Sequence, residues 1–231
     1  LSNREYKTAA RIAEELKKIG YEPKTGIAKT GVVAILNPGK PGPVVGLRAD
    51  IDALPVKERA DIPWASKMKG VYNGEEVPVM HACGHDMHTA ILLAAAKILY
   101  DIKDEIPGQV KFIFQPAEEG GAGAKAMIDD GLVTRFNIDE FYGIHNMPGI
   151  ETGKFAIRQG PLMASADRFK IILTGKGGHA AMPHLAVDTT LVAAQILVNL
   201  NLIVSRSIDP LKRVVVTAGT FKTDSSALNV I

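Results

Sequence analysis

Apolar and polar positions along the first two thirds of the chain follow two periods, one typical of helices and one of strands. Apolar residues at helical spacing predict helices at about 3–19, 89–102 and 124–130. Shorter apolar runs bounded by Gly, Pro and polar residues predict strands at 31–36, 44–47, 109–114 and 140–145. Strands that alternate with helices are typical of βαβ units, so we expect an α/β fold with a largely parallel sheet flanked by helices.

Two further features predict how these elements are organised. The linker 37–43 is rich in Pro and Gly, and we expect the strands on either side of it to be neighbours. After about Gly160 the pattern changes to strands at 169–174 and 213–221 around a helix at 187–204, and a last strand begins near Ala227. This second pattern predicts a small α+β unit.

Composition narrows the class of protein. The 231 residues fit one or two domains, and 46% hydrophobic with 23% charged residues is ordinary for a globular chain. The net charge of 27 − 25 = +2 forms no basic stripe, so we expect no nucleic-acid partner. The apolar runs are too short to cross a bilayer, so we expect no membrane partner.

The cysteine count and the chain ends bear on location and completeness. The single cysteine, Cys83, excludes an internal disulfide, and no signal peptide is visible, so we expect a cytoplasmic protein. The chain opens without Met and stops inside a predicted strand, so we expect it to be incomplete.

The densest chemical cluster lies between His81 and His88, where three His, one Asp and the only Cys occur within eight residues. Cys83 and His85, separated by one glycine, can reach the same cation, and thiolate and imidazole are preferred zinc ligands. Asp86 and His88 can orient such ligands by hydrogen bonds. The alternative, a polar turn before a helix with Cys83 buried, does not account for this density.

Polar side chains also follow three of the predicted strands. Asp50 and Asp52 follow the strand at 44–47, Glu118-Glu119 follows the strand at 109–114, and His145 ends the last one. Because the carboxyl ends of parallel strands meet at one edge of a sheet, we expect these groups to gather there. Adjacent carboxylates point to opposite sides, so one Glu can bind metal while the other is a general base. Solvated turns and strand-end salt bridges are the structural alternatives.

A glycine-rich loop at 175–184 carries His179. It lacks the spacing of a phosphate-binding loop and no helix opens directly from it, so nucleotide binding is excluded. We expect a flexible loop that presents His179.

Several runs occur together in a recognisable order, and they include Arg48-Ala-Asp-Ile-Asp52, His81-Ala-Cys-Gly-His85-Asp86, Gln115-Pro-Ala-Glu-Glu119, Gly143-Ile-His145, Gly177-Gly-His-Ala-Ala181 and Asn229-Val-Ile231. Together they resemble the amidohydrolase branch of the metallo-aminoacylase/carboxypeptidase family, which includes hippurate hydrolase, indoleacetyl-amino-acid hydrolases and N-acetyldiaminopimelate deacetylase. The resemblance implies a zinc-peptidase-like catalytic domain at 1–162 and an inserted α+β, ferredoxin-like lid and dimerisation domain at 163–231, both truncated.

The resemblance also implies roles for individual residues. The ligands of a pair of divalent ions map to Cys83, His85, Glu119 and His145. The general base maps to Glu118, and the Asp that supports the metal centre maps to Asp52. The lid residues that bind substrate map to His179, which is expected to reach a partner subunit's site, and to Asn229. Family members carry one more ligand His in a C-terminal segment that this chain lacks, so we expect one of the two metal positions to be weakened.

The expected activity is hydrolysis of the amide bond of N-acyl amino acids or short peptides by a homodimer. A metal-activated water attacks the acyl carbonyl, Glu118 takes its proton, and His179 helps to stabilise the oxyanion. The ions are expected to be Mn²⁺ or Zn²⁺, with Co²⁺ or Ni²⁺ as alternatives. Other functions stay open. One is a non-catalytic metal-binding dimerisation protein or an inactive fragment of such an enzyme, and another is a thiol-dependent hydrolase with Cys83 as nucleophile and His81, His85 or His88 as base.

Overall fold

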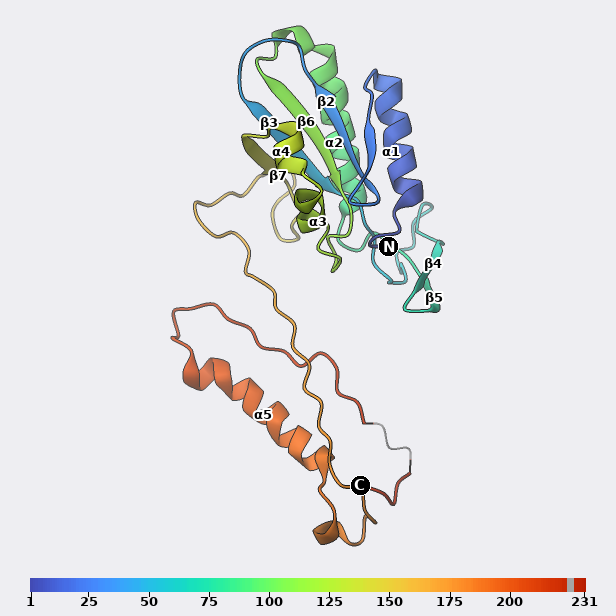
Figure 1. Ribbon diagram of the computed structural model, residues 1–231, viewed down its shortest axis with the longest axis vertical. Coiled ribbons are helices and arrows are strands. Elements are labelled where there is room, and N and C mark those ends of the chain that lie inside the picture. The colour runs from blue at the N-terminus through green and yellow to red at the C-terminus, as the bar shows by residue number, and fades with distance from the viewer. Residues whose placement is uncertain (224–226) are drawn as a thin grey trace. The chain divides into compact units, whose positions relative to one another are not determined.

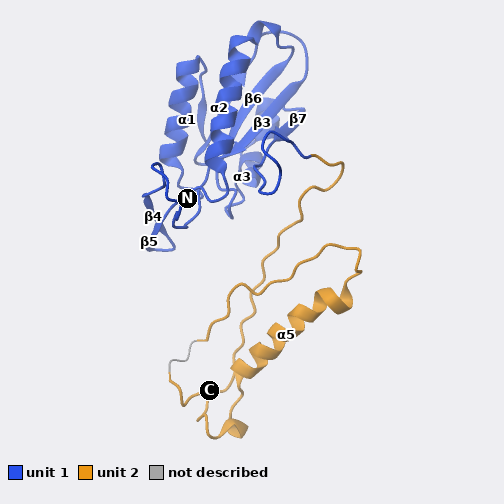
Figure 2. Cartoon of the chain, turned by 180° about the vertical axis from the view of Figure 1, so that it is seen from behind, with its two compact units in different colours: residues 1–156 blue, residues 157–231 orange. Residues whose placement is uncertain are grey.

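The computed structural model describes residues 1–223 and 227–231, which divide into two compact units, Leu1–Ala156 and Ile157–Ile231 (Figure 2). The first unit holds a five-stranded sheet between two layers of helices (Figure 1). The second unit consists of one long helix and extended segments.

The sheet of the first unit has the strand order β1-β2-β6-β3-β7. Its strands are β1 (Lys24–Ile27), β2 (Gly31–Leu36), β3 (Val44–Asp50), β6 (Gln109–Gln115) and β7 (Glu140–Gly143). Strand β3 pairs in parallel with both β6 and β7, whereas β2 is antiparallel to its neighbours β1 and β6. Four of the five strands therefore point the same way, and the predicted α/β class with a largely parallel sheet is confirmed.

Strand β6 lies between β2 and β3, so the prediction that the strands around the linker 37–43 are neighbours is wrong. Every residue of β6 after Gln109 is buried, which is the pattern of a strand covered on both faces. The linker crosses this strand, a span of two strand spacings or about 10 Å, which seven residues reach easily. A strand that is buried along almost its whole length thus takes the centre of the sheet.

Two pairs of helices cover the two faces of the sheet (Figure 1). Helices α1 (Tyr6–Ile19) and α2 (His85–Asp101) cover one face, where Leu16 and Leu92 join a cluster with Phe112. Helices α3 (Gly123–Asp129) and α4 (Leu132–Phe136) cover the other, where Met127 packs with Ile113. Strands β2 and β6 are buried along almost their whole length, so the middle of the sheet is a firm support for the groups at its edge.

Helix α2 begins at His85, four residues before the predicted start at 89. Gly84 precedes it with φ +80°, a left-handed conformation that glycine adopts without steric cost, and the chain turns directly into the helix. His85 and His88 therefore lie three positions apart on one helix face, and both are buried.

Other short elements were not predicted. They are β1, helix α4, a hairpin of β4 (Lys69–Tyr72) and β5 (Glu75–Pro78), and a 3₁₀ turn at Lys103–Glu105. The hairpin turns at Asn73-Gly74, where both residues have positive φ, the backbone of a type I′ turn. The Asn-Gly dipeptide is typical of such turns, so this hairpin could have been predicted from the sequence.

In the second unit, the predicted helix at 187–204 is present as α5 (Thr189–Ser207), and a 3₁₀ turn at Pro183–Leu185 precedes it. The Asp188 carboxylate caps α5 by accepting hydrogen bonds from the backbone N–H groups of Thr190 and Leu191.

The strands predicted at 169–174, at 213–221 and from Ala227 are not formed. Within the described part of this unit, pairing is limited to single bridges, Lys176 with Val187 and His179 with Val230. An extended segment becomes a strand only when a neighbour supplies a continuous ladder, and the apolar pattern alone does not supply one.

Helix α5 is long and apolar enough to cross a membrane by length and composition, and none of its residues is buried. The core helices of soluble domains pass the same test, so one such helix is a weak indication of a membrane.

Candidate metal centre

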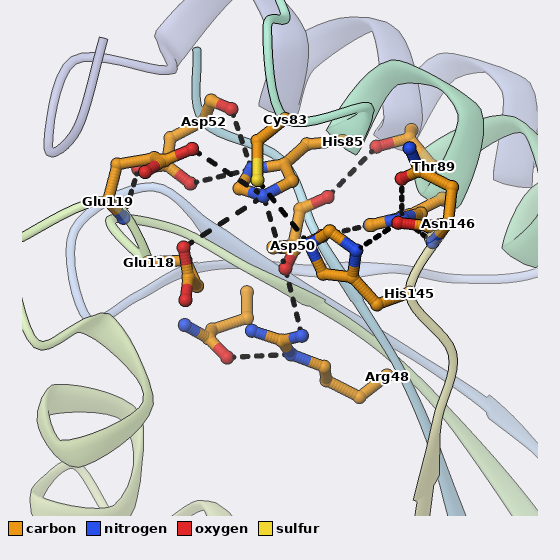
Figure 3. A network of polar contacts seen from close by, with 12 residues as sticks. Arg48, Asp50, Asp52, Cys83, His85, Thr89, Glu118, Glu119, His145 and Asn146 are labelled. Atoms are coloured by element: carbon orange, nitrogen blue, oxygen red, sulfur yellow. Dashed lines mark hydrogen bonds and ion pairs between the residues drawn. The ribbon is translucent and has the colours of Figure 1, made fainter. Parts of the chain in front are cut away.

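The carboxyl ends of β3, β6 and β7 bring the polar groups of the first unit together. Asp50, the last residue of β3, pairs in register with Gln115, the last residue of β6. The turn after β6 carries Glu118 and Glu119, and the chain after β7 carries His145. The first turn of α2 adds His85 at the same edge (Figure 3).

The side chains predicted as metal ligands form one cluster centred on His85 (Figure 3). Cys83 Sγ lies 3.4 Å from His145 Nε2. His85 Nε2 lies 3.8 Å from Glu119 Oε1 and 3.9 Å from Glu118 Oε2. Potential ligand atoms of Cys83, His85 and His145 lie within 4.8 Å of one another, and so do those of His85, Glu118 and Glu119. His85 belongs to both groups, which suits a centre with two adjacent ions.

The surroundings of two atoms show whether this cluster fits a cation. His85 Nε2 and Glu119 Oε1 are buried, and within the described ranges 1–223 and 227–231 neither has a hydrogen-bond partner. Buried polar atoms without a partner are costly and rare, and a shared cation would satisfy both. Imidazole, carboxylate and thiolate together suit zinc and other first-row divalent ions. The residues present therefore fit a metal centre.

Asp52 fixes the orientation of His85 from the side away from the cluster. His85 Nδ1 lies 2.8 Å from the Asp52 carbonyl oxygen and 3.2 Å from its Oδ1, so Nδ1–H donates and Nε2 is left to face the cluster. Burial alone would raise the pKa of Asp52, but the hydrogen bonds that its carboxylate accepts outweigh burial and lower the pKa to about 2. The strongest come from His85, from the Ser2 hydroxyl and from the Glu119 backbone.

A second buried network lies beside the cluster. Asp50 Oδ1 lies 2.6 Å from His88 Nδ1, and His88 Nε2 accepts the backbone N–H of Asn146 at 3.0 Å. Arg48 pairs with the other Asp50 oxygen at 2.9 Å. The network ties β3 and α2 to the residue after His145. Asn146 was not predicted as a site residue, and only its place next to His145 could have drawn attention to it.

The environment of Cys83 argues against a thiol nucleophile. Burial, followed by the nearby Glu119 carboxylate, raises the pKa of the thiol to about 11, whereas an activated nucleophile needs a lowered pKa. The imidazole within hydrogen-bond distance of Cys83 is His145, not one of the three His expected as its base.

His179 and Asn229 belong to the second unit, where the structure brings them onto two adjacent extended segments. The Ala180 backbone N–H donates to the Asn229 carbonyl oxygen at 2.9 Å, and His179 forms a bridge with Val230. Both side chains are exposed, and His179 Nδ1 accepts the backbone N–H of Ala181. Their contribution to a substrate site stays a prediction.

Residues 46–225 match the sequence profile described as Peptidase family M20/M25/M40. The chain belongs to this peptidase family. Among its relatives is an N-acetyl-L-cysteine deacetylase of Bacillus subtilis, 45% identical over 100% of this chain and 53% of that protein. A hippurate hydrolase of Campylobacter jejuni is also 45% identical, over 97% of this chain and 56% of that protein.

Two solved structures agree with this chain in fold. An aminohydrolase from methicillin-resistant Staphylococcus aureus has a TM-score of 0.80 at 36% identity and covers 100% of this chain and 59% of that one. A dinuclear metal-binding M20 peptidase of Bacillus subtilis has a TM-score of 0.66 at 33% identity, over 87% of this chain and 52% of that one. The predicted resemblance is confirmed, and this chain spans about half the length of these M20 relatives.

Proposed function

We propose that this M20 chain takes part in metal-dependent hydrolysis of the amide bond of N-acyl amino acids or short peptides. The observation that carries the proposal is the convergence of two buried atoms, His85 Nε2 and Glu119 Oε1, beside Cys83 and His145. Neither atom has a hydrogen-bond partner among the described residues. The names of the relatives, a deacetylase and a hippurate hydrolase, support this substrate class.

Four side chains would hold the ions: Cys83, His85, Glu119 and His145. The proposed cofactor is a pair of Mn²⁺ or Zn²⁺ ions, and Co²⁺ and Ni²⁺ suit the same donors. When bound, such ions supply Lewis acidity, which lowers the pKa of a water toward about 7 and polarises an acyl carbonyl.

Glu118 is the proposed general base. Its side chain is 42% exposed and its Oε2 lies 3.9 Å from His85 Nε2, so it borders the ligand cluster while it stays open to substrate. It would take a proton from the attacking water and return it to the leaving amine. Asp52 would hold His85 in its ligating orientation throughout.

We further propose that residues 1–162 are the catalytic part of the protein, and that residues 163–231 form a lid that also mediates a homodimer. In this arrangement, His179 would contact the acyl carbonyl and Asn229 would lie near the substrate carboxylate. The proposed location is cytoplasmic, as expected for a chain with one cysteine.

The proposal is tested with Glu118→Gln and a matched control, Glu22→Gln, which changes an exposed Glu on the loop after α1. Each purified chain is stripped of metal, reloaded with Mn²⁺ or Zn²⁺ and analysed by mass spectrometry for ions per chain. Amine release from N-acetyl and N-benzoyl amino acids then gives the rate. We expect both variants to keep the wild-type metal content, and Glu118→Gln alone to lose turnover by about 10²- to 10⁴-fold.

Three results would contradict the proposal. A folded wild-type chain that retains no metal would refute the ligand set. Metal-loaded wild type without turnover on any acyl amino acid would refute the activity. A near wild-type rate in Glu118→Gln would refute the role of that residue.

A further inference from the structure

The N-terminal segment Ser2–Glu5 lies against the loop that carries Glu118 and Glu119. Glu5 Oε1 accepts the backbone N–H of Ala117 at 2.9 Å, across 112 positions of sequence. Ser2 Oγ donates to Asp52 Oδ2 at 2.6 Å, and the Glu119 backbone N–H donates to the same oxygen at 3.0 Å. The segment therefore touches the acidic loop at one point and its carboxylate support at another.

Glu5 is a buried carboxylate, although it lies at the start of α1, where an exposed side chain is usual. The residue is 3% exposed. Oε1 also accepts the Asn3 backbone N–H at 2.9 Å, and Oε2 accepts the Thr30 hydroxyl at 2.6 Å. Three donors thus converge on one carboxylate, and one of them is the backbone of the acidic loop. A buried carboxylate that accepts three hydrogen bonds holds the donor groups in fixed positions.

Ala117 is the residue of the loop whose backbone conformation most needs a fixed hydrogen-bond partner. It has φ +53°, a left-handed conformation that a residue with a Cβ rarely adopts, and it is fully buried. A strained residue keeps its conformation only when its surroundings impose it. The next two residues are Glu118 and Glu119, so the backbone angle at Ala117 sets where both carboxylates lie.

We propose that Glu5 is a positioning residue that holds Ala117 in its left-handed conformation and so directs Glu119 to the metal cluster and Glu118 to the substrate side. This inference rests on the proposed function of that cluster. By this inference, α1 and the residues before it help to position the site, although none of their side chains lies among the candidate ligands of the described structure.

The first experiment measures the affinity of the chain for Mn²⁺ alone by titration calorimetry. We expect Glu5→Ala to weaken binding by about 10- to 100-fold, the usual effect of removing a group that orients a ligand. Thr30→Val is the matched control, because it removes the hydroxyl that donates to Glu5 Oε2 and leaves the contact of Oε1 with Ala117 in place. It should lower stability but leave the affinity near that of wild type. Glu5→Gln should restore affinity, since its amide oxygen can still accept the Ala117 N–H.

The second measurement is hydrogen exchange at the Ala117 amide in metal-free protein. We expect a protected amide in wild type and Thr30→Val, and fast exchange in Glu5→Ala. If Glu5→Ala does not fold, Glu5→Asp replaces it, because a carboxylate shorter by one methylene cannot reach Thr30 and Ala117 together.

Each outcome decides the inference. Wild-type affinity in Glu5→Ala, or equal losses in Glu5→Ala and Thr30→Val, would overturn it. Fast exchange at Ala117 in wild type would overturn it as well. If wild type binds no metal, the proposed function fails, and the exchange experiment still decides whether Glu5 holds Ala117.

Discussion

Gly84 offers a sharp test of the site, because it lies between Cys83 and His85 and takes a backbone conformation that suits glycine. Its φ is +80°, and a Cβ added there would lie 2.2 Å from Asn146 Oδ1 and 2.6 Å from Asn146 Cγ. The Asn146 side chain is itself in contact with buried His88. Gly84→Ala therefore imposes backbone strain and also displaces Asn146.

The two effects can be separated by magnitude. A left-handed non-glycine residue costs about 1–2 kcal/mol. Displacing the Asn146 side chain breaks its part-buried contact with His88 Nε2, which adds about 1–3 kcal/mol. Since 1 kcal/mol shifts Tm by about 2–4 °C in a chain of this size, we expect Gly84→Ala to lower Tm by about 4–20 °C.

Gly26→Ala is the matched control for the strain alone. Gly26 has φ +81°, almost the same as Gly84, and a Cβ there would meet nothing within 4 Å. We expect this variant to lose only about 1–2 kcal/mol, which lowers Tm by about 2–8 °C. It lies in the edge strand β1, in the same unit as the metal cluster.

The assay combines thermal unfolding followed by circular dichroism with calorimetric titration of Mn²⁺. Because Gly84→Ala moves the backbone between Cys83 and His85, we expect its affinity for Mn²⁺ to fall by about tenfold or more. Gly26→Ala should bind as wild type does. If Gly84→Ala is no less stable than Gly26→Ala and binds Mn²⁺ equally well, Asn146 does not occupy the position described, and the reasoning is refuted.

Two further variants test other parts of the first unit. In Cys83→Ala loaded with Co²⁺, we expect loss of the thiolate-to-metal charge-transfer absorption and an affinity lower by about 100-fold; a band that persists would show that the sulfur is not a ligand. Lys111 lies buried in β6, and its pKa is lowered by burial and then by the charge of Lys24. Between this lowered pKa and the ordinary pKa of lysine, the unfolded chain binds more protons than the folded chain. The unfolding free energy of wild type therefore rises with pH in that range. Lys111→Met should remove that rise and be more stable at pH 7 by about 1 kcal/mol, as denaturant titrations from neutral to alkaline pH would show; an unchanged pH slope would contradict this reasoning.

The place of the site could be predicted from the sequence because it depends on short segments and one general rule. In the sequence, the apolar run at 44–47 is followed closely by Asp50, and the strand predicted at 140–145 ends in His145. Parallel strands bring those ends to one edge whatever the order of the strands. An error in the strand order therefore leaves the predicted place of the site unchanged.

The strand order itself could not be predicted, because it depends on where a strand that is distant in the sequence joins the sheet. The turn-rich linker 37–43 is compatible with a hairpin and with a crossover. The choice depends on β6, which begins only at Gln109. The strands expected in the second unit failed for a related reason. The apolar and β-branched residues at 169–174 favour an extended backbone, but only a partner segment makes it a strand.

The residues that support the site were the least predictable, and Glu5 shows why. In the sequence it is an ordinary acidic residue at the start of an amphipathic helix, where carboxylates are common because they favour the helix dipole. Only the fold places its Oε1 against Ala117, and only the backbone angle at Ala117 reveals a strained position that needs a partner. Ligands can be inferred from their chemistry, since few side chains bind metals. Supporting residues use the hydrogen-bonding groups that every polar residue carries, so their role can be recognised only from their position.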